Sequence, residues 1–105
     1  MLEPHSVVVA TFVAPRERIW GELVGIRPEG VTLRGIGLDS FEEFLQQSLR
    51  EGKSEVCMST AFYPMHRVER IALDEPLGLV GSLSDTFRDR VGMTIQEYLG
   101  IPETR

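Results

Sequence analysis

The sequence is short of the residues on which several classes of protein depend. Its single cysteine, Cys57, cannot form a disulfide within the chain and is typical of a reducing compartment. No apolar run approaches the roughly 20 residues that a membrane-spanning helix needs. The first five residues lack the basic stretch and apolar core of a secretory signal. We therefore expect a cytoplasmic protein with no membrane segment.

Positive charge is also scarce. Lys53 is the one lysine among 11 basic residues, and 16 acidic residues bring the net charge to −5. Nucleic-acid-binding proteins usually carry an excess of Lys and Arg, because neutralising phosphates supplies much of their affinity. The charge balance therefore argues against general affinity for nucleic acids or anionic membranes. A basic patch on one face would not be visible in this sum.

Motifs that carry catalysis or bind metals are missing as well. The sequence contains no GxSxG nucleophile motif and no phosphate-binding loop, and the glycine pair at residues 35–37 lacks the third glycine of a dinucleotide-binding motif. His5, Cys57 and His66 stand apart, at no metal-ligand spacing. Cys57 lies in an apolar stretch and is typical of an inert buried thiol. We expect no enzyme activity, no cofactor and no metal.

What is present is the composition of one folded domain: 105 residues, of which 42% are apolar and 26% charged. Apolar and β-branched residues predict five strands, at residues 6–13, 19–26, 31–36, 56–63 and 67–73. Pro28-Glu29-Gly30 predicts a tight turn, which makes the second and third strands a hairpin. Gly21 and Gly25 indicate a bend or a close backbone approach in the second strand.

Three short patterns predict helices. Ser40 and Glu43 have the spacing of a capping box, and the apolar residues that follow predict a helix over about residues 40–51 that ends at Gly52. Two further pairs with this spacing predict a C-terminal helical segment over residues 82–100; they are Ser82 with Asp85 and Thr94 with Glu97. We expect one mainly β domain with helices over residues 1–105, its five bent strands forming a small closed or partly open barrel.

The stretch 19–36, IWGELVGIRPEGVTLRGI, resembles the first motif of the Sm-like proteins, a branch of the SH3-like barrels. The stretch 62–71, FYPMHRVERI, resembles their second motif, in which one strand ends in a tight turn and the next starts at once. The positions that match the first motif are Gly21, Leu23, Val31 and Leu33. The resemblance covers about residues 6–73. It implies a five-stranded barrel, here with a helix inserted between strands three and four, which forms rings through its edge strands.

The nucleotide pocket of the family does not carry over in the same way. Sm-like proteins that bind uridine use an asparagine after the first motif and an arginine–glycine pair in the second. This sequence contains no asparagine, and its Arg67 and Arg70 are followed by valine and isoleucine. The resemblance therefore implies the fold and the ring more than it implies RNA binding.

Six residues are candidates for contact with a ligand or a nucleic acid. His66 lies in a tight turn, where it could reach a ligand or a base, or simply face solvent. Trp20 lies near Arg16 and Arg18 and could stack on a base, although we favour packing in the core or at a subunit interface. Arg34 is expected to be a solvated strand residue. The six candidates are Trp20, Arg34, Tyr63, His66, Arg67 and Arg70.

The nearly all-apolar first strand carries the functional hypothesis. A small barrel can scarcely bury such a strand on both faces alone, and an exposed one would aggregate. We therefore expect a non-enzymatic interaction module that forms a homo-oligomer, such as a ring, and that binds protein partners. Two alternatives stay open: an RNA-binding Sm-like ring, and a domain that binds or converts a small molecule.

Overall fold

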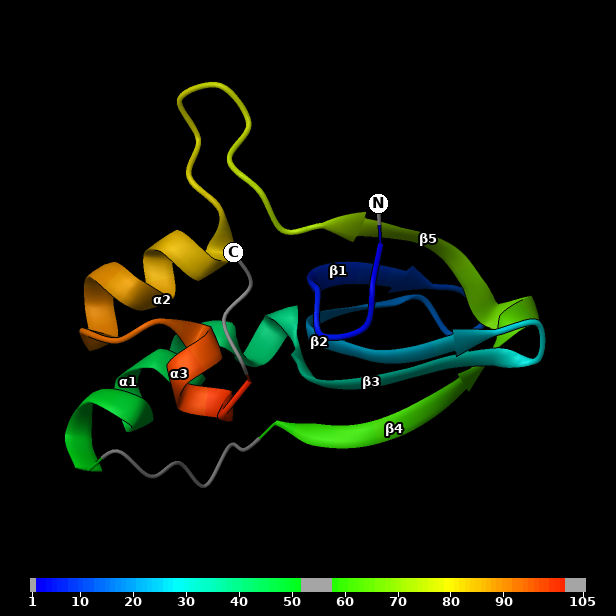
Figure 1. The fold of residues 1–105 in the computed structure, drawn as a ribbon, viewed down its shortest axis with the longest axis horizontal. Coiled ribbons are helices and arrows are strands. Elements are labelled where there is room, and N and C mark those ends of the chain that lie inside the picture. Colours follow the sequence, from blue (N-terminus) through cyan, green and yellow to red (C-terminus); the bar gives the residue numbers. More distant parts are fainter. Residues whose placement is uncertain (1, 52–57, 102–105) are drawn as a thin grey trace.

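The computed structural model describes residues 2–51 and 58–101, and at residues 50–51 it describes the backbone alone. An antiparallel sheet of five strands forms the centre of the molecule. Figure 1 shows the helices gathered at one end of this sheet. In chain order the elements are β1 (Val7–Phe12), β2 (Glu17–Arg27), β3 (Gly30–Gly37), η1 (Leu38–Ser40), α1 (Phe41–Glu51), β4 (Ser59–Pro64), η2 (Met65–Arg67), β5 (Val68–Leu73), α2 (Leu83–Val91) and α3 (Ile95–Leu99). The prediction of five strands with a few helices is confirmed, and the strands form one antiparallel sheet in a mixed α/β fold.

The strand order is β4-β3-β2-β1-β5. The predicted hairpin of β2 and β3 is present, with Leu23 opposite Leu33 and a bulge just after this pair. At Gly21 and Gly35, which face each other across the hairpin, the strands approach so closely that a Cβ on either glycine would collide with the other strand's backbone. β4 and β5 are the two edges, and η2 alone joins them in the chain. The two edges do not pair, so the sheet is not closed.

One face of the sheet curls around an apolar cluster. Side chains of a strand alternate between the two faces of a sheet, so every second residue of β1, β2 and β3 points into this cluster. The ring of Phe12 on β1 stacks on that of Tyr63 on β4, with 4.1 Å between the ring centroids. Because β2 and β3 lie between these strands in the sheet, the stack requires strong curvature. The buried members are Val8, Ala10, Phe12, Ile19, Leu23, Val31 and Leu33.

The helices cover part of the other face and form a second apolar cluster with it. Trp20 on β2 is fully buried at its centre, and its ring contacts Phe41, Phe44 and Phe87 at centroid distances of 5.1, 6.4 and 6.2 Å. Such ring packing adds to the hydrophobic gain from burying the large side chains. The buried members are Val7, Trp20, Ile36, Phe44, Leu45, Phe87 and Ile95.

The expectation that one chain cannot bury its first strand is wrong. In β1, Val8, Ala10 and Phe12 are buried in the curled face, while Val7 belongs to the cluster under the helices. Thr11 is also buried. One face of β1 is covered by the curled sheet and the other by the helices. β1 also pairs with β2 and β5, so it presents no free edge. The apolar first strand therefore gives no reason for a second copy.

Two of the three predicted helix starts are confirmed. The side chains of Ser82 and Thr94 each accept a hydrogen bond from the backbone N–H three residues on. The carboxylates of Asp85 and Glu97 accept hydrogen bonds from the backbone N–H groups of Ser82 and Thr94 in turn. α1 begins differently, because the 3-10 turn η1 takes the place of the predicted capping box at Ser40. The predicted stop at Gly52 and the first residues of the predicted fourth strand, with Cys57, lie outside the described residues.

Candidate interaction surface

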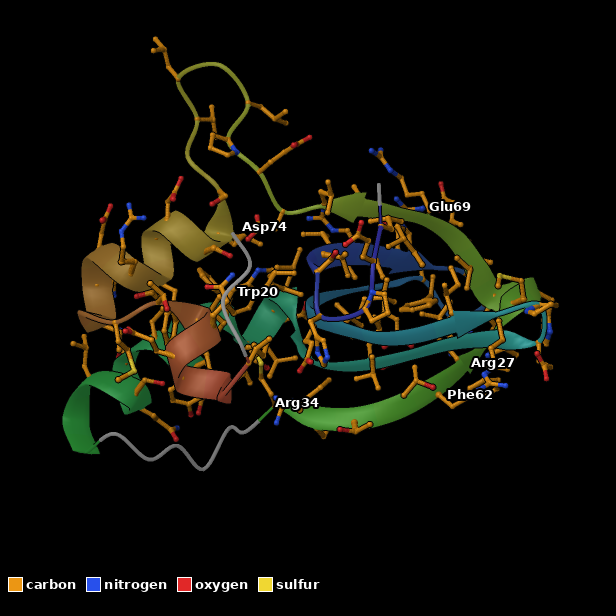
Figure 2. The ribbon with its side chains drawn as sticks, viewed as in Figure 1. Trp20, Arg27, Arg34, Phe62, Glu69 and Asp74 are labelled. Atoms are coloured by element: carbon orange, nitrogen blue, oxygen red, sulfur yellow. The ribbon has the colours of Figure 1, made fainter. Side chains whose placement is uncertain are left out.

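Trp20 is committed to the core. Its indole N–H donates a hydrogen bond to the carboxylate of Asp74, 2.9 Å away, just after β5 (Figure 2). With its side chain fully buried, the ring offers no face to a base. The packing interpretation of this residue is confirmed.

Arg67 holds the turn between β1 and β2. Its Nε donates to the carbonyl of Val13 at 2.9 Å, and its Nη2 donates to the carbonyl of Pro15 and to the Glu17 carboxylate, each at 2.8 Å. The guanidinium also lies over the ring of Phe12, 5.7 Å from its centroid. These contacts occupy the group that would otherwise bind a phosphate.

Arg34 is not a solvated strand residue, contrary to the expectation from sequence. Its guanidinium donates from Nε and Nη2 to the carboxylate of Glu22, at 3.0 and 2.9 Å, and from Nη2 to the carbonyl of Leu99 at the end of α3. The Glu22 side chain is only 5% exposed, and His5 Nδ1 lies 2.6 Å from its other oxygen. The cluster joins β2 and β3 to α3 and to the segment before β1.

The other three candidates lie near the turn between β4 and β5, and they differ from one another. Tyr63 is half-buried against Phe12. The side chains of His66 and Arg70 are both exposed, and neither makes a hydrogen bond or an ion pair within the described part of the chain. The structure therefore leaves His66 and Arg70 free to contact a partner.

The pKa of the Tyr63 phenol is raised above its usual value because of burial, with a further contribution from the carboxylate of Glu17. We expect a Tyr98→Phe variant, in which Tyr63 is the remaining tyrosine, to form tyrosinate at a higher pH when folded than when unfolded, because burial raises the pKa of this phenol. Ultraviolet absorbance measures this titration, and the same titration in denaturant is the control. Equal midpoints in the folded and the unfolded chain would contradict the expected effect of burial.

β4 is an edge strand with little protection. It pairs with β3 on one side only, and none of its six residues is charged. Phe62 in its middle is 56% exposed. Its ring lies against the backbone of Gly30, so closely that a Cβ added to Gly30 would be 2.5 Å from the Phe62 Cζ atom. Natural proteins guard their edge strands with charges, bulges or proline. Here Pro64, at the end of the strand, is the one such device.

β5, the opposite edge, is better protected. Glu69 and Arg70 lie at its centre, and Glu69 pairs with Arg16 at 3.2 Å. Figure 2 shows Glu69 and Phe62 on opposite sides of the sheet. The two edges of one molecule thus differ in chemistry.

A second exposed apolar feature follows β5. Residues 76–81, PLGLVG, form a protruding loop that we call the apolar finger; it stands clear of the sheet and the helices in Figure 1. Leu77 and Val80 are each 70% exposed, and Leu79 is fully exposed. The backbones of Leu77 and Val80 exchange hydrogen bonds of 2.8 and 3.0 Å, and Gly78 between them has a φ of +60°. The finger is therefore an ordered turn.

Sequence reasoning missed this finger. Loops usually carry polar residues, because their side chains face water. Six successive loop residues without one polar side chain were the signal that could have revealed it.

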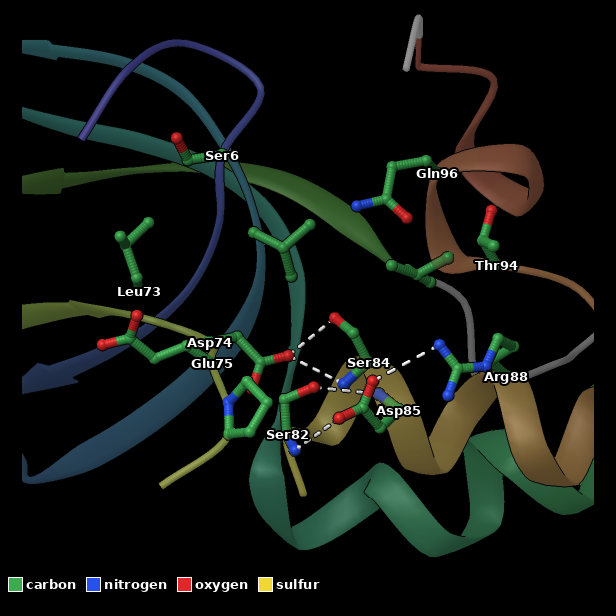
Figure 3. Close-up of a pocket in the computed structure, with 13 residues that line it drawn as sticks. Ser6, Leu73, Asp74, Glu75, Ser82, Ser84, Asp85, Arg88, Thr94 and Gln96 are labelled. Atoms are coloured by element: carbon green, nitrogen blue, oxygen red, sulfur yellow. Dashed lines mark hydrogen bonds and ion pairs between the residues drawn. The ribbon is translucent and has the colours of Figure 1, made fainter. Parts of the chain in front are cut away.

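A shallow cavity of about 410 Å³ lies where β1, β5, α2 and α3 meet (Figure 3). The carboxylate of Asp74 on its wall accepts hydrogen bonds from the backbone N–H groups of Leu83 and Ser84 and from the Ser84 hydroxyl. Asp85 caps α2 and pairs with Arg88 at 3.4 Å. These acidic groups stabilise the start of α2, and they give no reason to infer a ligand.

The described residues contain no group of three or more His, Cys, Asp or Glu that could hold a metal ion. Within the same residues, no helix has the length and apolar character to cross a membrane. Comparisons with protein-family models, with curated proteins and with solved structures give no match for the chain.

Proposed function

We propose that this protein is a non-enzymatic interaction module that assembles with itself, the β4 edge of one copy pairing with the β5 edge of the next. The observation that carries the proposal is the uncharged β4 edge with its exposed Phe62. Free N–H and C=O groups on such an edge are a template for another strand. Pairing them would cover an edge that the described residues leave without charges.

The position of the edges supports an assembly of more than two copies. β4 and β5 are different surfaces, so their pairing is head-to-tail, and head-to-tail contacts produce rings or filaments. The order β4-β3-β2-β1-β5, the short η2 link and the curvature at the Phe12–Tyr63 stack are compatible with the Sm-like barrel that the sequence resembles. A divergent Sm-like barrel that closes into a ring is therefore part of the proposal.

RNA binding is not part of it. Three of the six candidate contact residues are occupied in holding the fold: Trp20 by Asp74, Arg34 by Glu22, and Arg67 by the β1–β2 turn. The net charge of −5 also argues against binding to RNA.

The native mass in solution tests the proposal. Light scattering coupled to size-exclusion chromatography should give a discrete multiple of the 11.8 kDa chain. A Phe62→Lys variant adds a charge to the β4 edge and should weaken assembly at least about 10-fold, as expected for the loss of a central apolar anchor. Because Phe62 is exposed, the variant should keep its fold, which circular dichroism verifies.

Ile26→Lys is the matched control, since Ile26 is 50% exposed and lies on β2, away from both edges. We expect it to assemble like the wild type. A wild type that is monomeric at every concentration would overturn the proposal. So would a Phe62→Lys variant that keeps the wild-type mass.

A further inference from the structure

We propose that the apolar finger is the second half of this assembly interface, with Leu79 of one copy docking on Leu49 at the end of α1 of the next copy. This inference rests on the self-assembly proposed above and names a surface that strand pairing alone does not use. Leu79 is fully exposed and Leu49 is 51% exposed. Both apolar side chains therefore lack cover within the described part of a single chain.

The arrangement of the elements places the two surfaces on opposite sides of the molecule. β5 and the finger lie along one side, and β4 and α1 lie along the other (Figure 1). When β5 of one copy pairs antiparallel with β4 of the next, the last residue of β5, Leu73, comes near the first residue of β4, Ser59. The chain after Leu73 then continues past the start of β4, toward the helical end of the neighbour. The finger is the segment that follows, and α1 is at that end.

The size of the strand contact gives an independent reason for a second one. β4 and β5 have six residues each, so their pairing makes a narrow interface. Stable interfaces bury about 1,200–2,000 Å² in total. The finger can add the apolar surface of three side chains, and its two backbone hydrogen bonds order it before binding, which reduces the entropy lost on docking.

Charge argues for a protein surface over a membrane surface as the occupant. Asp74 and Glu75 precede the finger, and Asp85 follows it. Arg88, the nearby cation, is paired with Asp85 and with Asp89. Anionic membranes attract segments flanked by Lys and Arg and repel acidic ones. The uncharged finger between acidic flanks is therefore better matched to an apolar site on a second copy.

Disulfide trapping tests the contact directly. In a Cys57→Ser background, a copy carrying Leu79→Cys is mixed with one carrying Leu49→Cys under mild oxidation. We expect a disulfide between the two different variants, because bridged residues must have Cα atoms within about 7 Å of each other. The control replaces Leu49→Cys with Ile26→Cys, which is equally exposed but pairs with Val31 beside the β2–β3 turn, and should give no such product. Equal trapping at both positions would overturn the inference.

A Leu79→Glu variant separates this inference from the proposed function. Leu79 is fully exposed, so the fold should be unchanged, while assembly should weaken about 10-fold from the loss of one buried leucine. If the wild type assembles and Leu79→Glu assembles equally well, the finger contact is wrong and the strand pairing stands. If the wild type is monomeric, both proposals fail. Binding of the wild type, but not of Leu79→Glu, to phosphatidylcholine–phosphatidylserine vesicles with no change in mass would show a membrane finger and overturn the inference.

Discussion

Replacing Asp74 with alanine is expected to lower the free energy of unfolding by about 3 kcal/mol, from the loss of several hydrogen bonds to one charged acceptor. The carboxylate accepts from the indole of Trp20, from the backbone N–H groups of Leu83 and Ser84, and from the Ser84 hydroxyl. Alanine would leave the buried indole N–H and the backbone N–H groups of Leu83 and Ser84 without this acceptor, while the capping box of Ser82 and Asp85 would remain. One side chain thus joins the sheet to α2.

Urea unfolding followed by tryptophan fluorescence measures the effect, because Trp20 is the one tryptophan in the chain. Ser84→Ala removes a single one of these hydrogen bonds and should cost about 1 kcal/mol. Glu75→Ala, an exposed neighbour, should change stability by less than about 0.5 kcal/mol. If Asp74→Ala cost no more than Ser84→Ala, the carboxylate would not have the role assigned to it.

Replacing Arg34 with methionine is expected to cost about 2 kcal/mol, less than the penalty for breaking a fully buried ion pair, because the Glu22 side chain is 5% exposed but that of Arg34 is 35% exposed. The Glu22 carboxylate, with a side chain only 5% exposed, would lose its arginine partner and keep the contact with His5. The hydrogen bond from Arg34 to the carbonyl of Leu99 would also be lost. The end of α3 should therefore loosen together with the sheet.

The double variant Glu22→Gln/Arg34→Met removes the uncompensated charge and should recover part of the loss. A double-mutant cycle measured by urea unfolding gives the coupling between the two residues. Arg16→Met is the matched control, because its pair with Glu69 at 3.2 Å is exposed and should contribute less than about 1 kcal/mol. Similar losses for Arg34→Met and Arg16→Met would show that burial of Glu22 does not matter.

The parts of this fold that the sequence could predict depend on neighbouring residues. The caps at Ser82 and Thr94 each need a partner three positions away, and the β2–β3 hairpin needs the turn at Pro28-Glu29-Gly30. Signals of this kind lie within one turn of the chain. The same reasoning placed the strands close to their true positions, but beyond the β2–β3 hairpin it could not say which strands are neighbours.

The features that the sequence could not predict depend on that order. β5, far away in the chain, pairs with the second edge of β1, and Trp20 and Asp74 meet across 54 positions. Arg67 likewise reaches Val13 across 54 positions, so it fills a structural role that its place in a turn did not indicate. The candidate site moved for the same reason, from the arginines and the tryptophan to the β4 edge and the finger.

The central position of β1 also has a consequence for how the sheet is completed during synthesis. β2 and β3 can pair as soon as both have left the ribosome, and β1 can join β2 at that stage. Its second partner, β5, is the last of the five strands to be made. Until then the most apolar strand of the chain has an open edge, and pairing between distant segments is slow. Neighbouring nascent chains on the same mRNA would therefore be most prone to pair through the open edge of β1 before β5 emerges from the ribosome.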